Sequence, residues 1–214
     1  MQTTTSEPHT QQFWDNIAPK YAKKRVSDPA AYEAKLSRLR ALLNATDRVL
    51  EIGCGTGSTA LRLAPDVAHI TATDVSRGMI DIAQSKLGPD GPANVTFQQA
   101  DATGLIEGRP FDAICAFSLL HLIEDVPNLL DRVREQLKPG GLFISKTVCL
   151  KDSSFLLRAL VPVLTAMGIA PRLTFLSADD LRQLLRAAGF EIEQTAYLGA
   201  KRTNPFIVAR RTAV

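Results

Sequence analysis

The sequence predicts a single α/β domain in which a mostly parallel sheet is covered by helices on both faces. Its 214 residues are 45% apolar and 22% charged, which is typical of an ordinary globular domain with one real core. From Arg48 onward, short apolar runs alternate with helical patterns, as in right-handed βαβ units. The runs are apolar throughout, which favours strands buried on both sides. We therefore expect an N-terminal lid with a first helix (1–47) and a sheet-containing core (48–214).

The N-terminal part is expected to be a disordered polar tail over residues 1–10, followed by two helices. Pro19 should break or kink the first helix, because proline removes a backbone donor. Asp28 and Pro29 are typical of the cap and first turn of the second helix. The apolar residues of the first helix recur at helical spacing: Phe13, Trp14, Ile17, Ala18 and Tyr21.

The core is expected to begin with five parallel strands. These are the apolar runs Val49–Ile52, Ile70–Thr73, Val95–Phe97, Phe111–Phe117 and Leu142–Ile144. The helical patterns between them are Thr59–Ala64, Ser76–Leu87 and Pro127–Leu137. Pro139-Gly140-Gly141 should end the last of these helices and turn the chain into the next strand.

The C-terminal third begins with Ser153–Ile169, which is apolar apart from one charge. Ser177 and Asp180 form a variant of the capping box that opens a helix, and Gly189 closes it. Two strands follow, Glu191–Leu198 and Phe206–Ala209. They are close enough in sequence to pair antiparallel.

Composition excludes several classes of protein. No uncharged apolar stretch approaches the roughly 18 residues of a membrane span, and no secretory signal is expected. A net charge of +3 is too weak to indicate nucleic-acid binding. Cys54, Cys115 and Cys149 are odd in number and lack metal-ligand spacing, so we expect no metal and a reducing, cytoplasmic location.

A glycine-rich loop lies between the first strand and the next helix, at the edge of the sheet where ligands bind in open α/β folds. Gly53, Gly55 and Gly57 allow a tight turn and the close approach of a ligand to the backbone. Asp74 ends the second run, 21 residues after Gly53, and an acidic side chain there can accept both hydroxyls of an adenosine ribose.

The loop argues against a nicotinamide dinucleotide. The dinucleotide fingerprint requires glycine at the position of Ser58, and here the third glycine comes one residue early. The carboxylate of Glu51 would repel a pyrophosphate, whereas it suits a ligand with positive charge near the ribose, such as an amino group or a sulfonium. A nicotinamide oxidoreductase is therefore the weaker alternative.

These residues resemble the class I S-adenosylmethionine-dependent methyltransferases. The resemblance rests on Glu51-x-Gly53-x-Gly55-x-Gly57, Asp74, Asp101-Ala102 and Pro139-Gly140-Gly141. It is strong over residues 48–150, and it is nearest to the small-molecule branch that includes quinone C-methyltransferases and bacterial phospholipid N-methyltransferases. The resemblance implies a Rossmann-like seven-stranded sheet of order 3-2-1-4-5-7-6 with strand 7 antiparallel. It also implies S-adenosylmethionine as cofactor and S-adenosylhomocysteine (SAH) as product.

The same resemblance implies a role for each matching residue. Asp74 would hold the ribose, Asp101 would accept the adenine amino group, and Glu51 would lie near the amino group of the methionine part. Taken alone, Met79 also suits the core and Asp101 a helix cap. The implied cofactor-binding residues are Tyr21, Glu51, Gly53, Cys54, Gly55, Gly57, Asp74, Val75, Met79, Asp101, Ala102, Phe117 and Ser118.

Few side chains are candidates for the acceptor side. His121 follows the fourth strand and is expected either to act as a general base or to pack against the cofactor. Lys146 ends the fifth strand and either reaches the acceptor or extends into solvent. The cluster Lys20–Arg25 is either a solvated face or a phosphate site. The aromatic residues of the first helix either close over the cofactor as a lid or pack on the sheet: Phe13, Trp14 and Tyr21.

The segment 151–176 is expected to cover the acceptor. Its helical stretch lacks a polar face, so both of its sides need cover. We expect Leu157 and Leu160 to contact an apolar acceptor that is methylated on O, N or S. Phospholipid N-methylation, with peripheral contact at the inner membrane surface, and a homodimer interface remain alternatives.

Two further functions are weighed against this interpretation. A nucleic-acid methyltransferase is disfavoured, because Phe117-Ser118-Leu119-Leu120 stands where enzymes acting on base amino groups carry an Asn/Asp-Pro-Pro-aromatic run. A cofactor-binding protein without catalytic activity is the other alternative. We expect a small-molecule partner and a monomer or homodimer.

Overall fold

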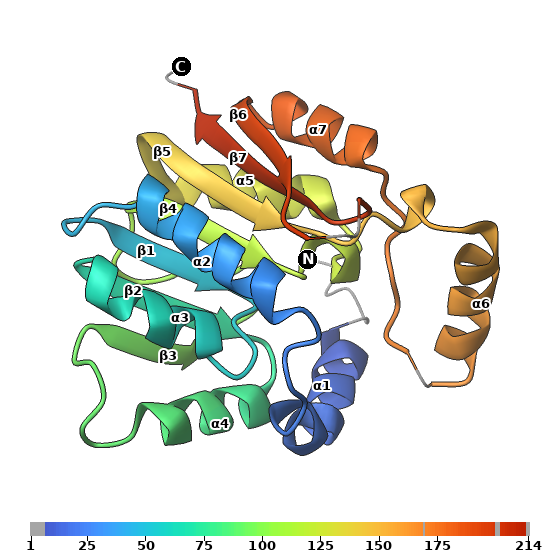
Figure 1. Ribbon diagram of the computed structural model, residues 1–214, viewed down its shortest axis with the longest axis horizontal. Coiled ribbons are helices and arrows are strands. Elements are labelled where there is room, and N and C mark those ends of the chain that lie inside the picture. The colour runs from blue at the N-terminus through green and yellow to red at the C-terminus, as the bar shows by residue number, and fades with distance from the viewer. Residues whose placement is uncertain (1–6, 169, 200–201, 213–214) are drawn as a thin grey trace, which may run out of the picture.

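The computed structural model describes residues 7–168, 170–199 and 202–212 and contains one seven-stranded sheet with helices on both faces (Figure 1). The strand order is β3-β2-β1-β4-β5-β7-β6, which confirms the predicted order. The first five strands are parallel, and β7 runs antiparallel to both β5 and β6, as predicted. The strands are β1 (Arg48–Ile52), β2 (His69–Asp74), β3 (Val95–Gln99), β4 (Phe111–Phe117), β5 (Leu137–Lys146), β6 (Phe190–Tyr197) and β7 (Pro205–Arg211).

The helices lie where the sequence predicts them, within a few residues at most boundaries. The α-helices are α1 (Glu7–Ala22), α2 (Pro29–Leu42), α3 (Ser58–Leu63), α4 (Arg77–Leu87), α5 (Val126–Gln136), α6 (Phe155–Ala166) and α7 (Ala178–Ala187). Three short 3₁₀ turns connect elements: η1 (Ala64–Asp66), η2 (Leu120–Leu122) and η3 (Leu150–Asp152). Asp28 caps α2, and Ser177 and Asp180 form the predicted capping box of α7.

The core has two layers, one on each face of the sheet. Leu36 and Leu39 of α2 pack with α3 and α4 on one face. Leu129 of α5 and Leu181 of α7 pack on the other. This double cover explains why the central strands are apolar on both sides.

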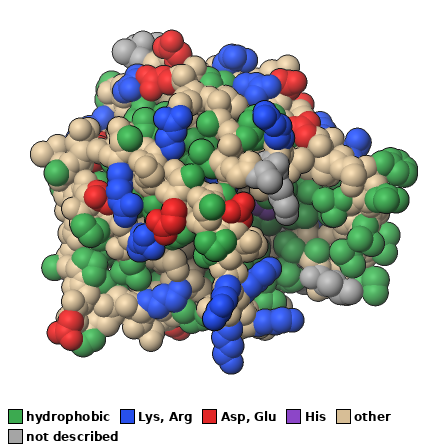
Figure 2. Space-filling model, viewed as in Figure 1, with side chains coloured by type: hydrophobic (Ala, Val, Ile, Leu, Met, Phe, Trp, Pro, Cys, Tyr) green, Lys and Arg blue, Asp and Glu red, His purple; other side chains and the backbone are tan. Residues whose placement is uncertain are grey.

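Helix α6 is the exception to this layering. It lies outside the two layers, at the right of Figure 1, and only Val161 among its residues is buried. Figure 2 shows hydrophobic side chains gathered over it. Within the described residues, no helix is long and apolar enough to cross a bilayer.

The structure corrects the prediction for α1. Residues 7–10, predicted as part of a disordered tail, are helical, and the helix continues through Pro19 to Ala22. Residues 1–6 lie outside the described part. Proline costs a helix one backbone hydrogen bond and a steric clash with the preceding turn. Here it is near the helix end, and the fully buried Ala18 anchors that end beside Gly78 of α4.

The structure also corrects the prediction for Pro139-Gly140-Gly141. This segment lies inside β5 instead of preceding it. Leu137 already pairs with Phe111 of β4, and the register then shifts before Ala113 pairs with Leu142. The extra residues form a bulge, in which Gly140 has a φ of +75°. Glycine suits this bulge because it adopts a positive φ without strain.

Candidate functional site

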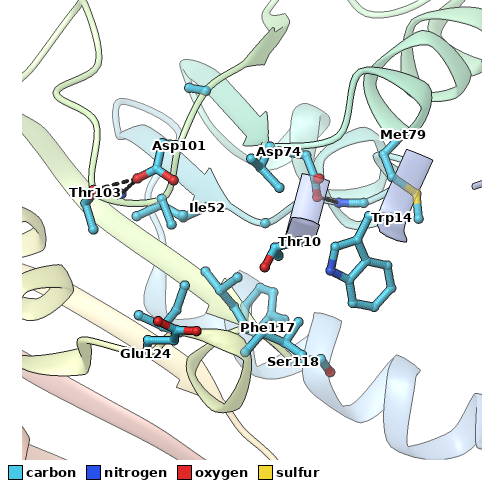
Figure 3. Close-up of a pocket in the computed structure, with 18 of the residues that line it drawn as sticks. Thr10, Trp14, Ile52, Asp74, Met79, Asp101, Thr103, Phe117, Ser118 and Glu124 are labelled. Carbon is cyan, nitrogen blue, oxygen red and sulfur yellow. Dashed lines mark hydrogen bonds between the residues drawn. The ribbon is translucent and has the colours of Figure 1, made fainter. Parts of the chain in front are cut away.

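A cavity of about 310 Å³ lies at the carboxyl ends of β1, β2 and β4, beneath α1 (Figure 3). In an open parallel sheet, this edge is where ligands bind. The structure therefore brings together residues from five separate segments of the sequence. The predicted site residues that line the cavity are Trp14, Tyr21, Gly53, Gly55, Asp74, Val75, Met79, Asp101, Ala102, Phe117 and Ser118.

The glycine-rich loop follows β1 and forms one wall. Gly53 has a φ of +69°, and a Cβ there would come within 2.9 Å of the side chain of Leu119. Gly55 has a φ of +54° and lies under the ring of Tyr21. Any side chain at either position would be strained and would take space from the cavity. The loop thus presents bare backbone to a ligand.

Asp74 ends β2 and holds the loop in place. Its Oδ2 accepts a hydrogen bond from the backbone N–H of Gly55 at 2.8 Å, and its Oδ1 accepts one from Ser76 at 2.9 Å. Burial raises the pKa of Asp74, although these two hydrogen bonds oppose the shift. Each carboxylate oxygen has a second lone pair, so both can still accept a hydroxyl from a ligand.

Asp101 lies at the other end of the cavity, after β3. Its Oδ1 accepts hydrogen bonds from the backbone N–H of Thr103 at 2.7 Å and from the Thr103 hydroxyl at 2.5 Å (Figure 3). These hydrogen bonds orient the carboxylate, and neither of them involves its Oδ2. Asp74 and Asp101 thus supply hydrogen-bond acceptors at two separate points of one cavity.

The fourth strand contributes a strained turn. Ser118 has a φ of +54° and is the one non-glycine residue with a positive φ within the described ranges. Its backbone N–H donates to the carbonyl of Lys146 at 2.7 Å, which holds the turn in place. Strained backbone of this kind concentrates at functional sites.

Helix α1 forms another wall of the cavity. Thr10, Trp14 and Tyr21 line it from this helix. Asp15 ties the helix to the start of α4, because its Oδ1 accepts from the Ser76 hydroxyl at 2.6 Å and from the Gly78 N–H at 2.9 Å. Burial alone would raise the pKa of Asp15, but these hydrogen bonds hold it below its usual value.

The structure does not bring Glu51 into the cavity. Its side chain is buried on the α2 face of the sheet, and its Oε2 has no hydrogen-bond partner among the described residues. Burial raises the pKa of Glu51, and the neighbouring Lys35 opposes this shift. Lys35 lies 4.2 Å from the centre of the Phe117 ring and donates to the hydroxyl of Thr59 at 2.9 Å. Glu51 thus lies near a buried lysine and is not among the residues that line the cavity.

Two other loop residues also lie outside the cavity lining. Gly57 packs under the loop, where a Cβ would meet the Phe97 ring at 2.6 Å. Cys54 donates its backbone N–H to the carbonyl of Thr73 at 2.9 Å. Both residues therefore fix the conformation of the loop through contacts with β2 and β3, and neither lines the cavity.

His121 lies in η2, next to the cavity-lining Leu122, and does not itself line the cavity. Burial lowers its pKa to about 4, so the imidazole is neutral at neutral pH. Its Nδ1 is buried without a hydrogen-bond partner in the described part of the chain. The carbonyl of His121 accepts a hydrogen bond from Thr174 at 2.8 Å, which joins η2 to the segment after α6.

The remaining predicted acceptor residues are spread around the site. Phe13 stacks edge-on against Trp14, 5.4 Å between ring centres, and does not line the cavity. Lys146 is half-buried at the end of β5, where burial lowers its pKa. Leu157 and Leu160 point into solvent from α6. The inner side of α6 instead lines a second cavity of about 460 Å³.

Sequence reasoning missed several lining residues. Thr10 was expected in a disordered tail, and Leu119 and Leu122 were not singled out as site residues. Thr103 carries a usable signal, because a threonine two residues after Asp101 is placed to hydrogen-bond its carboxylate. Glu124 has no such signal, since the turn that brings it to the cavity depends on tertiary packing.

Comparisons with known proteins agree with this geometry. A family model described as a methyltransferase domain matches residues 21–195. The ubiquinone biosynthesis O-methyltransferase of Azorhizobium caulinodans is 32% identical over 155 residues, which cover 70% of this chain and 60% of that protein. The chain spans between 40% and 65% of the length of the curated relatives that it matches.

Solved structures share the fold. The DhpI–SAH complex superposes with a TM-score of 0.75 at 24% identity, over 99% of both chains. The [4+2]-cyclase SpnF superposes with a TM-score of 0.78 at 22% identity, over 99% of this chain and 98% of that one. Likeness at this level of identity identifies the architecture, and the chemistry has to be argued from the site.

Proposed function

Because the chain belongs to the methyltransferase domain family, we propose that it transfers a methyl group from S-adenosylmethionine to a small, largely apolar acceptor. The observation that carries this proposal is the cavity at the carboxyl edge of the sheet. It combines the bare backbone of Gly53 and Gly55 with two separated carboxylates, Asp74 and Asp101. Its volume of about 310 Å³ is in the range of small-molecule sites.

The residues present fit this cofactor. Asp74 lines the cavity beside the glycine loop and would accept the hydroxyls of a ribose, and Asp101 would accept the amino group of an adenine. Val75 and Met79 line the same cavity and supply apolar surface to it. Glu51 supports the strand beneath the loop. Glu51 does not line the cavity, so the negative charge next to the ligand would come from Asp74 and Asp101.

When bound, S-adenosylmethionine supplies a methyl group on a positively charged sulfur, which leaves the protein to align, desolvate and deprotonate the acceptor. Helix α1 excludes water above the cavity through Trp14 and Tyr21. Phe117 and Leu119 offer apolar surface to an acceptor on the side towards η2. We propose residues 1–47 as lid and first helix and 151–176 as the segment that covers the acceptor.

The acceptor class is proposed from the lining and from a relative. The name of the Azorhizobium protein refers to ubiquinone biosynthesis and to O-methylation. An aromatic or alkyl-chain acceptor methylated on oxygen fits the apolar lining, whereas N- or S-methylation, including that of a phospholipid amine, is the second candidate. A monomeric or homodimeric state and a peripheral membrane contact belong to the same proposal.

His121 is proposed as the general base. Its imidazole is neutral, which is the protonation state of a base, and its buried Nδ1 has no partner in the described chain. Because His121 does not line the cavity in this structure, this role requires the acceptor to reach the imidazole past the cavity-lining Leu122. His121→Ala should lower kcat about 100-fold with SAH affinity unchanged. If the acceptor is a thiolate or a free amine, no base is needed and the variant stays active. A loss of SAH affinity in this variant would instead place His121 in the packing of the cofactor site.

The deciding experiment is isothermal titration calorimetry with SAH and with NAD, followed by an acceptor screen with labelled S-adenosylmethionine. We expect SAH to bind and NAD not to bind at the same concentration. The acceptor screen should label a phenol or quinol more strongly than thiols, amines or nucleic acid. Binding of NAD without SAH would overturn the assignment. Binding of SAH without label transfer to any acceptor would leave a cofactor-binding protein.

A further inference from the structure

Helix α6 exposes an apolar surface that nothing in the described chain covers. Phe155 and Leu156 are 78% and 79% exposed, and Met167 just beyond the helix is 65% exposed. Val163 is also exposed, and Arg158 is the one charged residue between Ser153 and Gly168. Exposed apolar patches of this kind mark interaction surfaces.

A basic segment lies across a hollow from this helix. In Figure 2, Lys and Arg side chains gather over the end of α1 and the chain that follows it, and the apolar patch of α6 lies on the other side of the hollow. The sequence there, Lys20–Val26, carries four cations and no acidic residue. The apolar Tyr21 and Val26 of this segment are 46% and 50% exposed. The two elements thus form one face that is apolar on one side and positively charged on the other.

This face is connected to the candidate site. Tyr21 belongs to the basic segment and lines the first cavity. The inner side of α6, with Val161 and Pro162, lines the second cavity together with residues 172–175. Glu124 lines both cavities, so the second cavity adjoins the first. A molecule that enters beneath α6 therefore arrives next to the candidate site.

We propose that α6 and Lys20–Val26 together dock this protein on a lipid bilayer with anionic headgroups. Apolar side chains on a helix with few charges enter the boundary between headgroups and acyl chains. In this orientation the four cations lie next to the anionic headgroups of the bilayer. Each cation strengthens binding about five-fold by electrostatic attraction. Apolar contact and positive charge each give weak binding alone, and together they give stable binding.

A second copy of this chain suits the face less well. A two-fold dimer brings the same patch against itself, so the four cations of one copy would lie near apolar α6 or near the cations of the other. Neither arrangement supplies an opposite charge, and like charges across an interface oppose association. An anionic bilayer matches both halves of the face at once.

The proposal that this surface binds a bilayer depends only on the exposed residues described above. The role of that binding in delivering an acceptor rests on the proposed function. An apolar acceptor dissolved in the bilayer would reach the site beneath α6 without crossing water.

The test is co-sedimentation with vesicles, without any cofactor. Vesicles contain either phosphatidylcholine alone or phosphatidylcholine with about one third phosphatidylglycerol. We expect binding to the anionic vesicles, and at least a ten-fold loss of affinity when the salt concentration rises several-fold, because salt screens the charges. Phe155→Glu with Leu156→Glu, and Lys20, Lys23, Lys24 and Arg25 all changed to Gln, should each abolish sedimentation at moderate salt.

The matched control removes four exposed cations from other helices: Arg38, Arg62, Arg132 and Arg186, all changed to Gln. It has the same net charge as the basic-segment variant and should sediment like the unmodified protein. Circular dichroism confirms that each variant is folded. The proposal is overturned by equal binding to neutral vesicles, by no binding to anionic ones, or by loss of binding in the control. It is also overturned if the unmodified protein is a dimer that the α6 variant splits into monomers. SAH calorimetry on the same samples reports on the proposed function separately.

Discussion

Asp74 combines a structural role with a proposed binding role, and the two can be separated. Its carboxylate fixes the glycine loop through Gly55 and fixes the start of α4 through Ser76. The same oxygens are the proposed acceptors for the ribose hydroxyls. A substitution of Asp74 therefore affects both the stability of the fold and the affinity for SAH. The experiment needs a control variant that lowers the stability alone.

Asp74→Ala should weaken SAH binding at least ten-fold, because each charge-assisted hydrogen bond is worth roughly 1.5–3 kcal/mol. Calorimetry measures the affinity and thermal unfolding measures the stability. Asp112→Ala is the matched control, since Asp112 also accepts a backbone N–H, that of Arg48 at 2.9 Å, and does not line the cavity. The control should lose stability and keep its affinity. Equal affinity in both variants would remove Asp74 from the proposed site.

His121 links the site to the pH dependence of stability. Burial lowers its pKa from 6.5 to about 4 in the folded protein, whereas the unfolded chain keeps the ordinary value. Above pH 6.5 neither state binds the proton. Between pH 6.5 and 4 the unfolded state binds it and the folded state does not, so the free energy of unfolding falls as the pH falls.

Glu51 and Asp74, whose pKa values burial raises, bind a proton more readily in the folded state and contribute the opposite slope, which a His121 variant shares with the unmodified protein. The free energy of unfolding of the unmodified protein should therefore fall relative to that of His121→Gln by up to about 1.4 kcal/mol per pH unit in that window, as urea unfolding at several pH values measures, and above pH 6.5 the difference between the two should stay constant. His69→Gln is the control, because His69 lies at the start of β2 beside Thr96 and is far less buried. A pH-dependent difference from the unmodified protein that is absent in His121→Gln and present in His69→Gln would contradict the assignment.

For single residues, the sequence predicted well which strand ends lie close together. It predicted less well the direction in which a side chain points. Gly53, Gly55, Asp74 and Asp101 each lie at or just after the carboxyl end of a parallel strand, so topology alone gathers them. Glu51 lies inside β1, where neighbouring residues alternate between the two faces. Its direction depends on register, and its buried partner Lys35 comes from α2, which no local pattern connects to it.

At the scale of elements, α1 is held over the cavity by its contacts with the start of α4. Asp15 accepts two hydrogen bonds from the first turn of α4, and Ala18 packs beside Gly78 below it. Since Thr10, Trp14 and Tyr21 belong to the same helix, the position of three lining residues depends on this contact. Asp15 is therefore a positioning residue for the lid.

Asp15→Asn should weaken SAH binding three- to ten-fold and speed SAH dissociation, while the core stays folded. Asparagine keeps an acceptor oxygen but removes its charge, and a neutral hydrogen bond is roughly half as strong as a charge-assisted one, so the helix shifts towards an open position without the loss of any cavity-lining group. Stopped-flow binding measures both rates. Asp81→Asn, an exposed carboxylate of α4 paired with Arg77, is the control and should bind SAH normally. Unchanged dissociation in Asp15→Asn would show that α1 does not act as a lid.

The errors in predicting elements have a common cause. Pro19 and Pro139-Gly140-Gly141 were both interpreted as interruptions, because proline and glycine disfavour regular structure locally. Tertiary contacts override this preference in both places: Ala18 is anchored on α4, and Leu137 pairs with Phe111 before the bulge. The caps themselves were predicted correctly: α2 begins at Pro29 after Asp28, and α7 begins directly after Ser177, three residues before the predicted start of its helical stretch at Leu181.

At the scale of the whole molecule, ligand binding should raise the melting temperature, Tm. A ligand at one hundred times its dissociation constant stabilises the folded state by about 2.7 kcal/mol. For a chain of this size, each kcal/mol moves Tm by roughly 2–4 °C, so SAH should raise Tm by about 5–10 °C. Differential scanning fluorimetry with NAD at the same concentration is the control and should show no shift. A shift with NAD alone would contradict the proposed cofactor.

The overall topology was predictable for two different reasons. Alternating strands and helices predict the parallel part, because right-handed crossovers allow few arrangements. The short turn before β7 predicts an antiparallel pair, and its insertion between β5 and β6 came only from the family resemblance. The placement of α6 was not predictable in the same way, because an apolar helix without a polar face can be covered from either side.

Trp14 is the chain's single tryptophan, and it lines the cavity beneath α1. The tryptophan emission of this protein therefore comes from one known place, and excitation at wavelengths that tyrosine does not absorb selects it from the three tyrosines. The edge of its ring faces Phe13 and Tyr21 at 5.4 Å and 6.3 Å between ring centres, so a rotation of the helix changes its surroundings at once. The protein carries its own optical probe, which allows closure of the helix to be followed in real time without a label.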